Sequence, residues 1–126
     1  MIDKYVHRVE SKLSEFLWLI KQKQISIEKI SDEMLIIRGR IVFIDESIVD
    51  FRELVTSKEI DYRYQYMTRA KKMIKRWDTA PHHPQIPTHP YHVHDGNEIK
   101  SSPKMNFIKV MDAVSKMVID NLIKEK

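Results

Sequence analysis

Five of the six histidines in this chain lie within thirteen residues, between His82 and His94. The unperturbed pKa of histidine is about 6.5, so its side chain both accepts and releases a proton near neutral pH. A cluster of histidines is therefore typical of acid–base catalysis or of metal binding. The candidates for proton transfer, together with a carboxylate that precedes the cluster, are His82, His83, His92, His94 and Asp78.

Three interpretations of this segment are open. The first is a metal site that uses His92 and His94, with Asp78 or Asp95 as an oxygen ligand. No familiar ligand spacing such as HExxH supports it, and we predict neither a metal nor another cofactor. The second is an exposed loop in which prolines and Trp77 pack the histidines. The third is RNA cleavage without a metal.

In metal-independent RNA cleavage, a base removes the proton of the ribose 2′-OH, an acid protonates the leaving 5′-oxygen, and cations stabilise the charged phosphorane. The histidines supply the base and the acid. Arg63 and Arg76 would lie near each other on one sheet face if their strands pair as a hairpin, and guanidinium groups bind phosphate through two hydrogen bonds. The stretch 58–76 carries a net charge of +5, which attracts a polyanion.

Aromatic side chains near this basic stretch offer ring faces on which unpaired bases stack. The candidates are Tyr62, Tyr64 and Trp77. The alternation of Tyr62, Tyr64 and Tyr66 is more often typical of a strand whose rings all face the core, and both interpretations stay open.

These residues need a sheet to position them. Apolar residues at helical spacing predict an amphipathic helix over 2–13. Period-two patterns then predict strands around residues 25–27, 35–43, 48–55, 60–67 and 73–77. Their short connections require antiparallel pairing, with Asp45-Glu46-Ser47 as one hairpin turn.

All five prolines lie between Pro81 and Pro103. Proline neither donates to a sheet nor continues a helix, so this segment is predicted to be an extended loop. Ser102 as N-cap and Pro103 as first helical residue predict a C-terminal helix, whose broad apolar stripe leaves room for a homodimer.

The chain, 1–126, is thus expected to form a single α+β domain. We predict an antiparallel β-meander of about five strands, with an N-terminal and a C-terminal helix and a Pro/His-rich loop.

Composition excludes several classes of protein. With 126 residues, 42% of them hydrophobic and 32% charged, the chain is long enough for one core and is not expected to be disordered. It has no cysteine, which excludes disulfides and cysteine-based zinc sites. No apolar run approaches about 20 residues and no N-terminal signal is visible, so we expect a cytoplasmic protein that does not enter a membrane. Phosphate loops, dinucleotide fingerprints and the serine-hydrolase elbow are also absent.

Several sequence blocks resemble the TumE family, the small toxin components of type II toxin–antitoxin systems, formerly a family of unknown function. The resemblance is carried by residues 38–45 (RGRIVFID), 62–64 (YRY) and 76–83 (RWDTAPHH), followed by Thr88, Pro90, His92 and His94. The block at 76–83 is the most specific. Within these blocks, the family motif falls on Arg38, Tyr62, Arg63, Tyr64, Arg76, Asp78, His82, His83, His92 and His94.

The chain departs from the family pattern at three positions. Thr79 stands where asparagine is expected, Glu46 where a turn glycine is usual, and His89 where an aromatic residue is typical. If the asparagine orients a histidine or the phosphate, Thr79 would alter the activity. His89 is left out of the predicted site.

The resemblance implies a growth-inhibiting toxin that acts on translation through RNA. It also implies a cognate antitoxin, usually with a helix-turn-helix DNA-binding domain. We therefore predict an RNA-binding toxin, a possible endoribonuclease, whose substrate-binding residues are Arg38, Arg63, Arg76, Tyr62, Tyr64 and Trp77. The alternatives are a non-catalytic RNA- or partner-binding module and a His-rich metal-dependent hydrolase.

Overall fold

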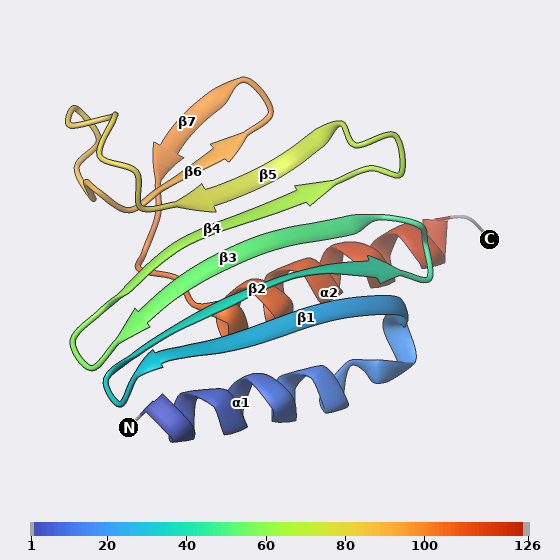
Figure 1. Cartoon of the computed structure of the whole chain (residues 1–126). Coiled ribbons are helices and arrows are strands. Elements are labelled where there is room, and N and C mark those ends of the chain that lie inside the picture. The colour runs from blue at the N-terminus through green and yellow to red at the C-terminus, as the bar shows by residue number, and fades with distance from the viewer. Residues whose placement is uncertain (1, 125–126) are drawn as a thin grey trace.

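The computed structural model describes residues 2–124. Along the chain, its elements are α1 (Ile2–Glu15), the short 3-10 helix η1 (Leu17–Leu19), β1 (Ile20–Ser31), β2 (Met34–Phe43), β3 (Ile48–Thr56), β4 (Ile60–Met67), β5 (Met73–Asp78), β6 (His92–Asp95), β7 (Glu98–Ser101) and α2 (Phe107–Lys124) (Figure 1).

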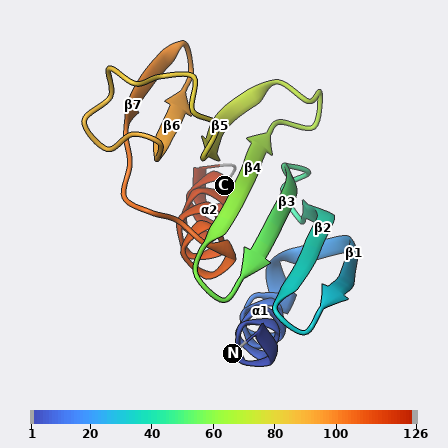
Figure 2. The ribbon, with the colours of Figure 1, turned by 60° about the vertical axis from the view of Figure 1, so that its left-hand side comes forward.

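The strands form one antiparallel sheet in which each strand pairs with its neighbours in sequence, from β1 to β7. Both helices lie against the same face, and the β6–β7 hairpin extends beyond them (Figure 1, Figure 2). The predicted α+β class and meander are confirmed. Over residues 2–124, neither helix has the length and apolar character that crossing a membrane requires.

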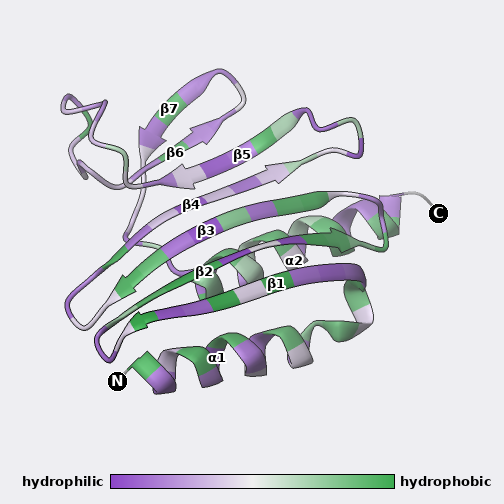
Figure 3. Cartoon of the chain, viewed as in Figure 1, coloured by the Kyte–Doolittle hydropathy of each residue, from purple (hydrophilic) through white to green (hydrophobic). Residues whose placement is uncertain are grey.

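The core lies between the sheet and the two helices. Strand alternation turns one set of side chains toward the helices, among them Tyr62, Tyr64 and Tyr66, which are all buried. From α2, Phe107 and Met111 pack against this face. Figure 3 shows that both helices also carry hydrophobic residues at intervals along their length. The tyrosine rings are therefore part of the core, which is one of the two interpretations that the sequence left open.

The structure has two strands more than the predicted five. β6 and β7 form a hairpin within the segment that was predicted to be a loop. Because the proline-rich stretch ends at Pro90, residues 92–101 are free to pair. Gly96 has a φ of 63° and is the first of the two residues that connect the strands, the position that type II′ hairpins give to glycine. The Gly96-Asn97 pair was the local signal for this turn, and the neighbouring prolines obscured it.

The C-terminal helix begins at Phe107, and the predicted start at Pro103 is wrong. Asn106 caps the helix, because its side-chain oxygen accepts a hydrogen bond from the N–H of Lys109 at 2.9 Å. Ser102 instead donates its hydroxyl to the carbonyl oxygen of Pro103 at 2.8 Å. The predicted turn at residues 45–47 is confirmed, and Glu46 there has a φ of 74°, a conformation that favours glycine.

A buried carboxylate joins the layers of the core. Glu53 on β3 is fully buried and accepts hydrogen bonds from the hydroxyl groups of Tyr5 and Tyr64. The Tyr5 oxygen also accepts the N–H of Phe107, the first residue of α2. Burial raises the pKa of Glu53 above its usual range, because the charged carboxylate is removed from water. This network connects α1, β3, β4 and α2.

Replacing Glu53 with alanine should lower the free energy of unfolding by about 2–4 kcal/mol, because two buried tyrosine hydroxyls lose their acceptor. Glu53→Gln keeps an acceptor and should cost far less. Since folding raises this pKa, the contribution of Glu53 to stability is complete below about pH 4.3 and is lost as the pH rises through the folded value. Urea denaturation from pH 4 to 7 should therefore show that the free energy of unfolding of Glu53→Gln rises relative to that of the wild type as the pH increases. A constant difference would contradict this account.

Candidate active site

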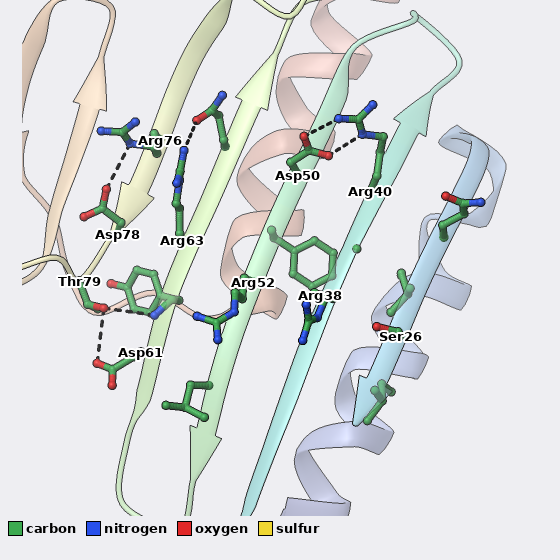
Figure 4. A pocket seen from close by; sticks show the side chains of 18 of the residues that line it. Ser26, Arg38, Arg40, Asp50, Arg52, Asp61, Arg63, Arg76, Asp78 and Thr79 are labelled. Atoms are coloured by element: carbon green, nitrogen blue, oxygen red, sulfur yellow. Dashed lines mark hydrogen bonds and ion pairs between the residues drawn. The ribbon is translucent and has the colours of Figure 1, made fainter. Parts of the chain in front are cut away.

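The register of the sheet aligns charged residues across the face that the helices leave open. Arg38 on β2, Arg52 on β3 and Arg63 on β4 stand directly opposite one another. The same register continues to Asp78 on β5 and to His92 on β6. We call Arg38, Arg52 and Arg63 the arginine row. All three are exposed, and Figure 4 shows them on the side of the sheet away from the helices.

A broad groove of about 1650 Å³ lies along this face. The arginine row, Arg76, Asp78 and His82 are among the residues that line it. Arg76 pairs with Gln65, two residues along β4 from Arg63. The two arginines therefore lie on the same face of the β4–β5 hairpin, as predicted from the sequence.

Asp78 contacts several ionisable side chains at one end of the groove. Its side chain is only 8% exposed. Oδ1 accepts the N–H of Ala80 at 3.0 Å and lies 2.8 Å from Nε2 of His92. Oδ2 lies 3.2 Å from Nε of Arg76 and 3.8 Å from Nε2 of His94. One buried carboxylate thus contacts an arginine and two histidines.

Both ring nitrogens of His92 lie close to oxygen atoms that accept hydrogen bonds. Its Nδ1 lies 2.9 Å from the carbonyl oxygen of Pro90, which only accepts hydrogen bonds. Its Nε2 faces the carboxylate of Asp78, which in its ionised form also only accepts. At 2% exposure, this side chain is shielded from solvent and orients its neighbours.

His94 has the opposite environment. Its Nε2 lies 3.3 Å from Nη2 of Arg76, and a guanidinium group can only donate, so this nitrogen must present its lone pair. The contact with Asp78, at 3.8 Å, is too long for a hydrogen bond. Burial, and then the charge of Arg76, lower the pKa of His94, while Asp78 opposes the shift. His94 is therefore suited to accept a proton at neutral pH.

His83 brings a third imidazole to the cluster from the proline-rich loop. Its ring centroid lies 4.9 Å from that of His92 and 5.5 Å from that of His94. One nitrogen from each of the three rings lies within 4.8 Å of the others, so these rings could hold a metal ion. Tetrahedral zinc would draw the nitrogens to about 3.4 Å from one another, so the rings would have to close in. The guanidinium of Arg76 beside His94 also disfavours a cation there.

Not all of the predicted site residues reach the groove. Of the four predicted histidines, only His82 lines the groove, where it is exposed. His92 and His94 contact Asp78, and the ring of His83 packs against both of them. The predicted stacking role of the aromatic residues is corrected, because their rings are buried in the core and cannot receive a base. These residues are Tyr62, Tyr64 and Trp77.

Thr79 does not contact the histidines. Its hydroxyl oxygen accepts the N–H of Tyr62 at 3.2 Å and donates to Asp61 at 3.5 Å. Its backbone N–H donates to the carbonyl oxygen of Tyr62 at 3.1 Å. The hydrogen bonds of Thr79 therefore extend the pairing between β4 and the chain after β5, and orient none of the three clustered rings.

Arg52 is the residue of this face that the sequence analysis missed. Alternation along 48–55 was weak, because the buried Glu53 interrupts the apolar pattern on the core face. The available signal was the spacing itself, since Asp50, Arg52 and Leu54 form the alternate set on this strand.

A model of the family described as "Toxin TumE" matches residues 5–123, nearly the whole chain. The chain has no significant match among curated proteins. It has no significant match among solved structures either.

Proposed function

The chain belongs to the TumE toxin family, and from this membership and the geometry of its open sheet face we propose that it is a toxin that inhibits translation by cleaving RNA without a metal. The observation that carries the proposal is the pair of histidines on Asp78. His92 contacts acceptors at both nitrogens, whereas His94 faces a donor. The ring centroid of His83 lies 5.5 Å from that of His94, so a base and a second imidazole that can serve as the acid are side by side, as acid–base catalysis requires.

Arg76 supplies the phosphate contact. Its buried Nε lies within ion-pair distance of Asp78 but lacks an aligned hydrogen-bond acceptor among residues 2–124. A phosphate oxygen would satisfy this donor through a charge-assisted hydrogen bond. When the guanidinium turns to a phosphate, it also frees Nε2 of His94.

In the proposed reaction, Nε2 of His94 takes the proton of a ribose 2′-OH. The 2′-oxygen forms a bond to phosphorus, and the bond from phosphorus to the 5′-oxygen breaks. His83, which is less buried than His92, gives a proton to that oxygen. The products are a 2′,3′-cyclic phosphate and a 5′-hydroxyl. Arg76 and Arg63 stabilise the charge that develops on the phosphorane.

The test is cleavage of RNA by purified protein in the presence of EDTA. We expect cleavage to persist in the chelator and to fall by at least about 100-fold in His83→Ala, because the leaving oxygen loses its proton donor. The product ends should be a cyclic phosphate and a 5′-hydroxyl, which end-labelling identifies. Cleavage that requires added metal would overturn this mechanism.

A metal-dependent hydrolase is the second candidate, and the cluster of His83, His92 and His94 favours it. In that case the purified protein would contain about one equivalent of a transition metal, and EDTA would abolish activity. A non-catalytic toxin would differ again, because alanine at the histidines would leave growth inhibition in cells intact.

Membership of a toxin family suggests an antitoxin partner. We extend the proposal to an antitoxin that carries a helix-turn-helix DNA-binding domain and is encoded beside the toxin. Co-expression of the neighbouring small open reading frame should restore growth. If no neighbouring open reading frame restores growth, this part of the proposal is wrong.

A further inference from the structure

The arginine row has an arrangement that the fold itself disfavours. Arg52 stands directly between Arg38 and Arg63 on adjacent antiparallel strands. Like charges at directly opposite positions destabilise a sheet. Within the described range, neither Arg52 nor Arg63 has a carboxylate at ion-pair distance. Arg38 has only a long contact of 3.7 Å with Glu28. Three adjacent strands thus present guanidinium groups that the fold does not neutralise.

A neighbouring pair on the same face shows the contrast. Arg40 and Asp50 are also opposite each other on β2 and β3, and their two hydrogen bonds measure 2.6 and 2.7 Å. This face can therefore neutralise an arginine by placing an acid across from it. In the arginine row, Arg52 has an arginine opposite it on both sides. Arg63 also has Asp78 opposite it on β5, but Asp78 is at ion-pair distance from Arg76, His92 and His94 and not from Arg63. Unneutralised guanidinium groups of this kind fit a ligand that carries several negative charges.

The row leads into the cluster of histidines. In the sheet register, the residue that follows Arg63 is Asp78, and the next is His92. Adjacent strands lie about 4.8 Å apart, so the arginines and Asp78 extend about 14 Å across the strands. The groove follows the same path, with the row and Asp78 among its lining residues (Figure 4). A ligand lying on the row would therefore reach Asp78 and Arg76 at the end of the groove, where Nη2 of Arg76 lies 3.3 Å from Nε2 of His94.

We propose that the arginine row is a track for the sugar–phosphate backbone of single-stranded RNA, which crosses β2, β3 and β4 and delivers one phosphate to Arg76. This inference rests on the proposed function. A guanidinium group binds a phosphate through two parallel hydrogen bonds and stacks on an unpaired base. It can therefore contact both the backbone and the bases of a single strand. A paired strand fits less well, because attack in line by the 2′-oxygen needs a nucleotide displaced from the stacked A-form helix.

Binding is measured separately from cleavage with a 12-nucleotide single strand of 2′-O-methyl RNA, which cannot be cut because its 2′-oxygen is blocked. With about four phosphates neutralised, the logarithm of affinity should fall with the logarithm of salt at a slope of about −2.8. Arg52→Ala should reduce this slope by about 0.7 and weaken binding about fivefold at 0.1 M salt. The matched control is Arg8→Ala, an exposed arginine on α1, which should bind as the wild type does.

The outcomes separate this inference from the proposed function. Equal binding by Arg52→Ala and Arg8→Ala overturns the track, whatever the cleavage assay shows. Tighter binding of a blunt 12-base-pair RNA duplex, or of polyglutamate, also overturns it, the latter in favour of an acidic protein segment. Salt-dependent binding that is weakened in Arg52→Ala, without any cleavage of unmodified RNA, supports the track and removes the nuclease. A thermal melt of each variant identifies loss of binding that is due to unfolding.

Discussion

Replacing His94 with glutamine should slow RNA cleavage by about 10²–10⁴-fold, the usual contribution of a general base. Glutamine is close in size and remains polar, so the sheet should keep its register at β6. Binding of the uncleavable 2′-O-methyl strand should change little, because Arg76 and the arginine row remain. Single-turnover rates and anisotropy titrations on the same preparation separate the two effects. The control is His89→Gln, an exposed histidine of the loop before β6 that lies outside the cluster.

The pH dependence of cleavage gives a second measurement of the same role. The pKa of His94 is lowered, first by burial and then by Arg76, against the opposing charge of Asp78 and with smaller contributions from His92 and His83. The unprotonated base therefore persists to lower pH than in free histidine. The ascending limb of kcat/KM should have its midpoint below pH 6.5. A midpoint above that value, or full activity in His94→Gln, would exclude this residue as the base.

Replacing Asp78 with alanine should have the largest effect on stability, about 3–5 kcal/mol in the free energy of unfolding. The reason is that the substitution leaves Nε2 of His92, whose side chain is 2% exposed, without the carboxylate 2.8 Å away. The N–H of Ala80 and the guanidinium of Arg76 lose a partner as well. Urea denaturation at pH 7 measures the loss, and cleavage should fall with it.

A second acid provides the control for this substitution. Asp61 is exposed on β4, lines the same groove and accepts only a long hydrogen bond from Thr79. Asp61→Ala should change stability by less than about 0.5 kcal/mol, as is usual for surface positions. Asp78→Asn keeps an acceptor for the N–H of Ala80 and removes the charge, so it should fall between the two alanine variants. Equal stability of all three variants would mean that the cluster is not a coupled ion pair.

Much of the scaffold could be predicted because the pattern was long and local. The alternation around Tyr62 and Tyr64 located β4, and the hairpin to β5 correctly placed Arg63 and Arg76 on one face. The same alternation could not say which face would be covered, because that depends on where the two helices dock. The rings proposed for stacking are therefore in the core, and the arginines are in the open.

The candidate site was harder to predict, because its chemistry depends on which atom faces which. The sequence identified the histidines but not their difference. That difference follows from the carbonyl oxygen of Pro90 beside His92 and from the guanidinium of Arg76 beside His94. Both contacts need the β6 strand, which was hidden in a segment predicted to be a loop. Arg52 was missed for a related reason, since its importance lies in its cross-strand neighbours and not in its own segment.

The tyrosine–carboxylate network around Glu53 has a consequence for how relatives of this chain can diverge. It ties together the two helices and the middle strands, whereas the histidines and Asp78 lie on β5, β6 and the loop between them, at the far edge of the sheet. Substitutions at exposed positions of the loop at residues 79–91 therefore leave this network intact. Members with this same architecture can inherit the scaffold and still differ in potency or target, or be inert.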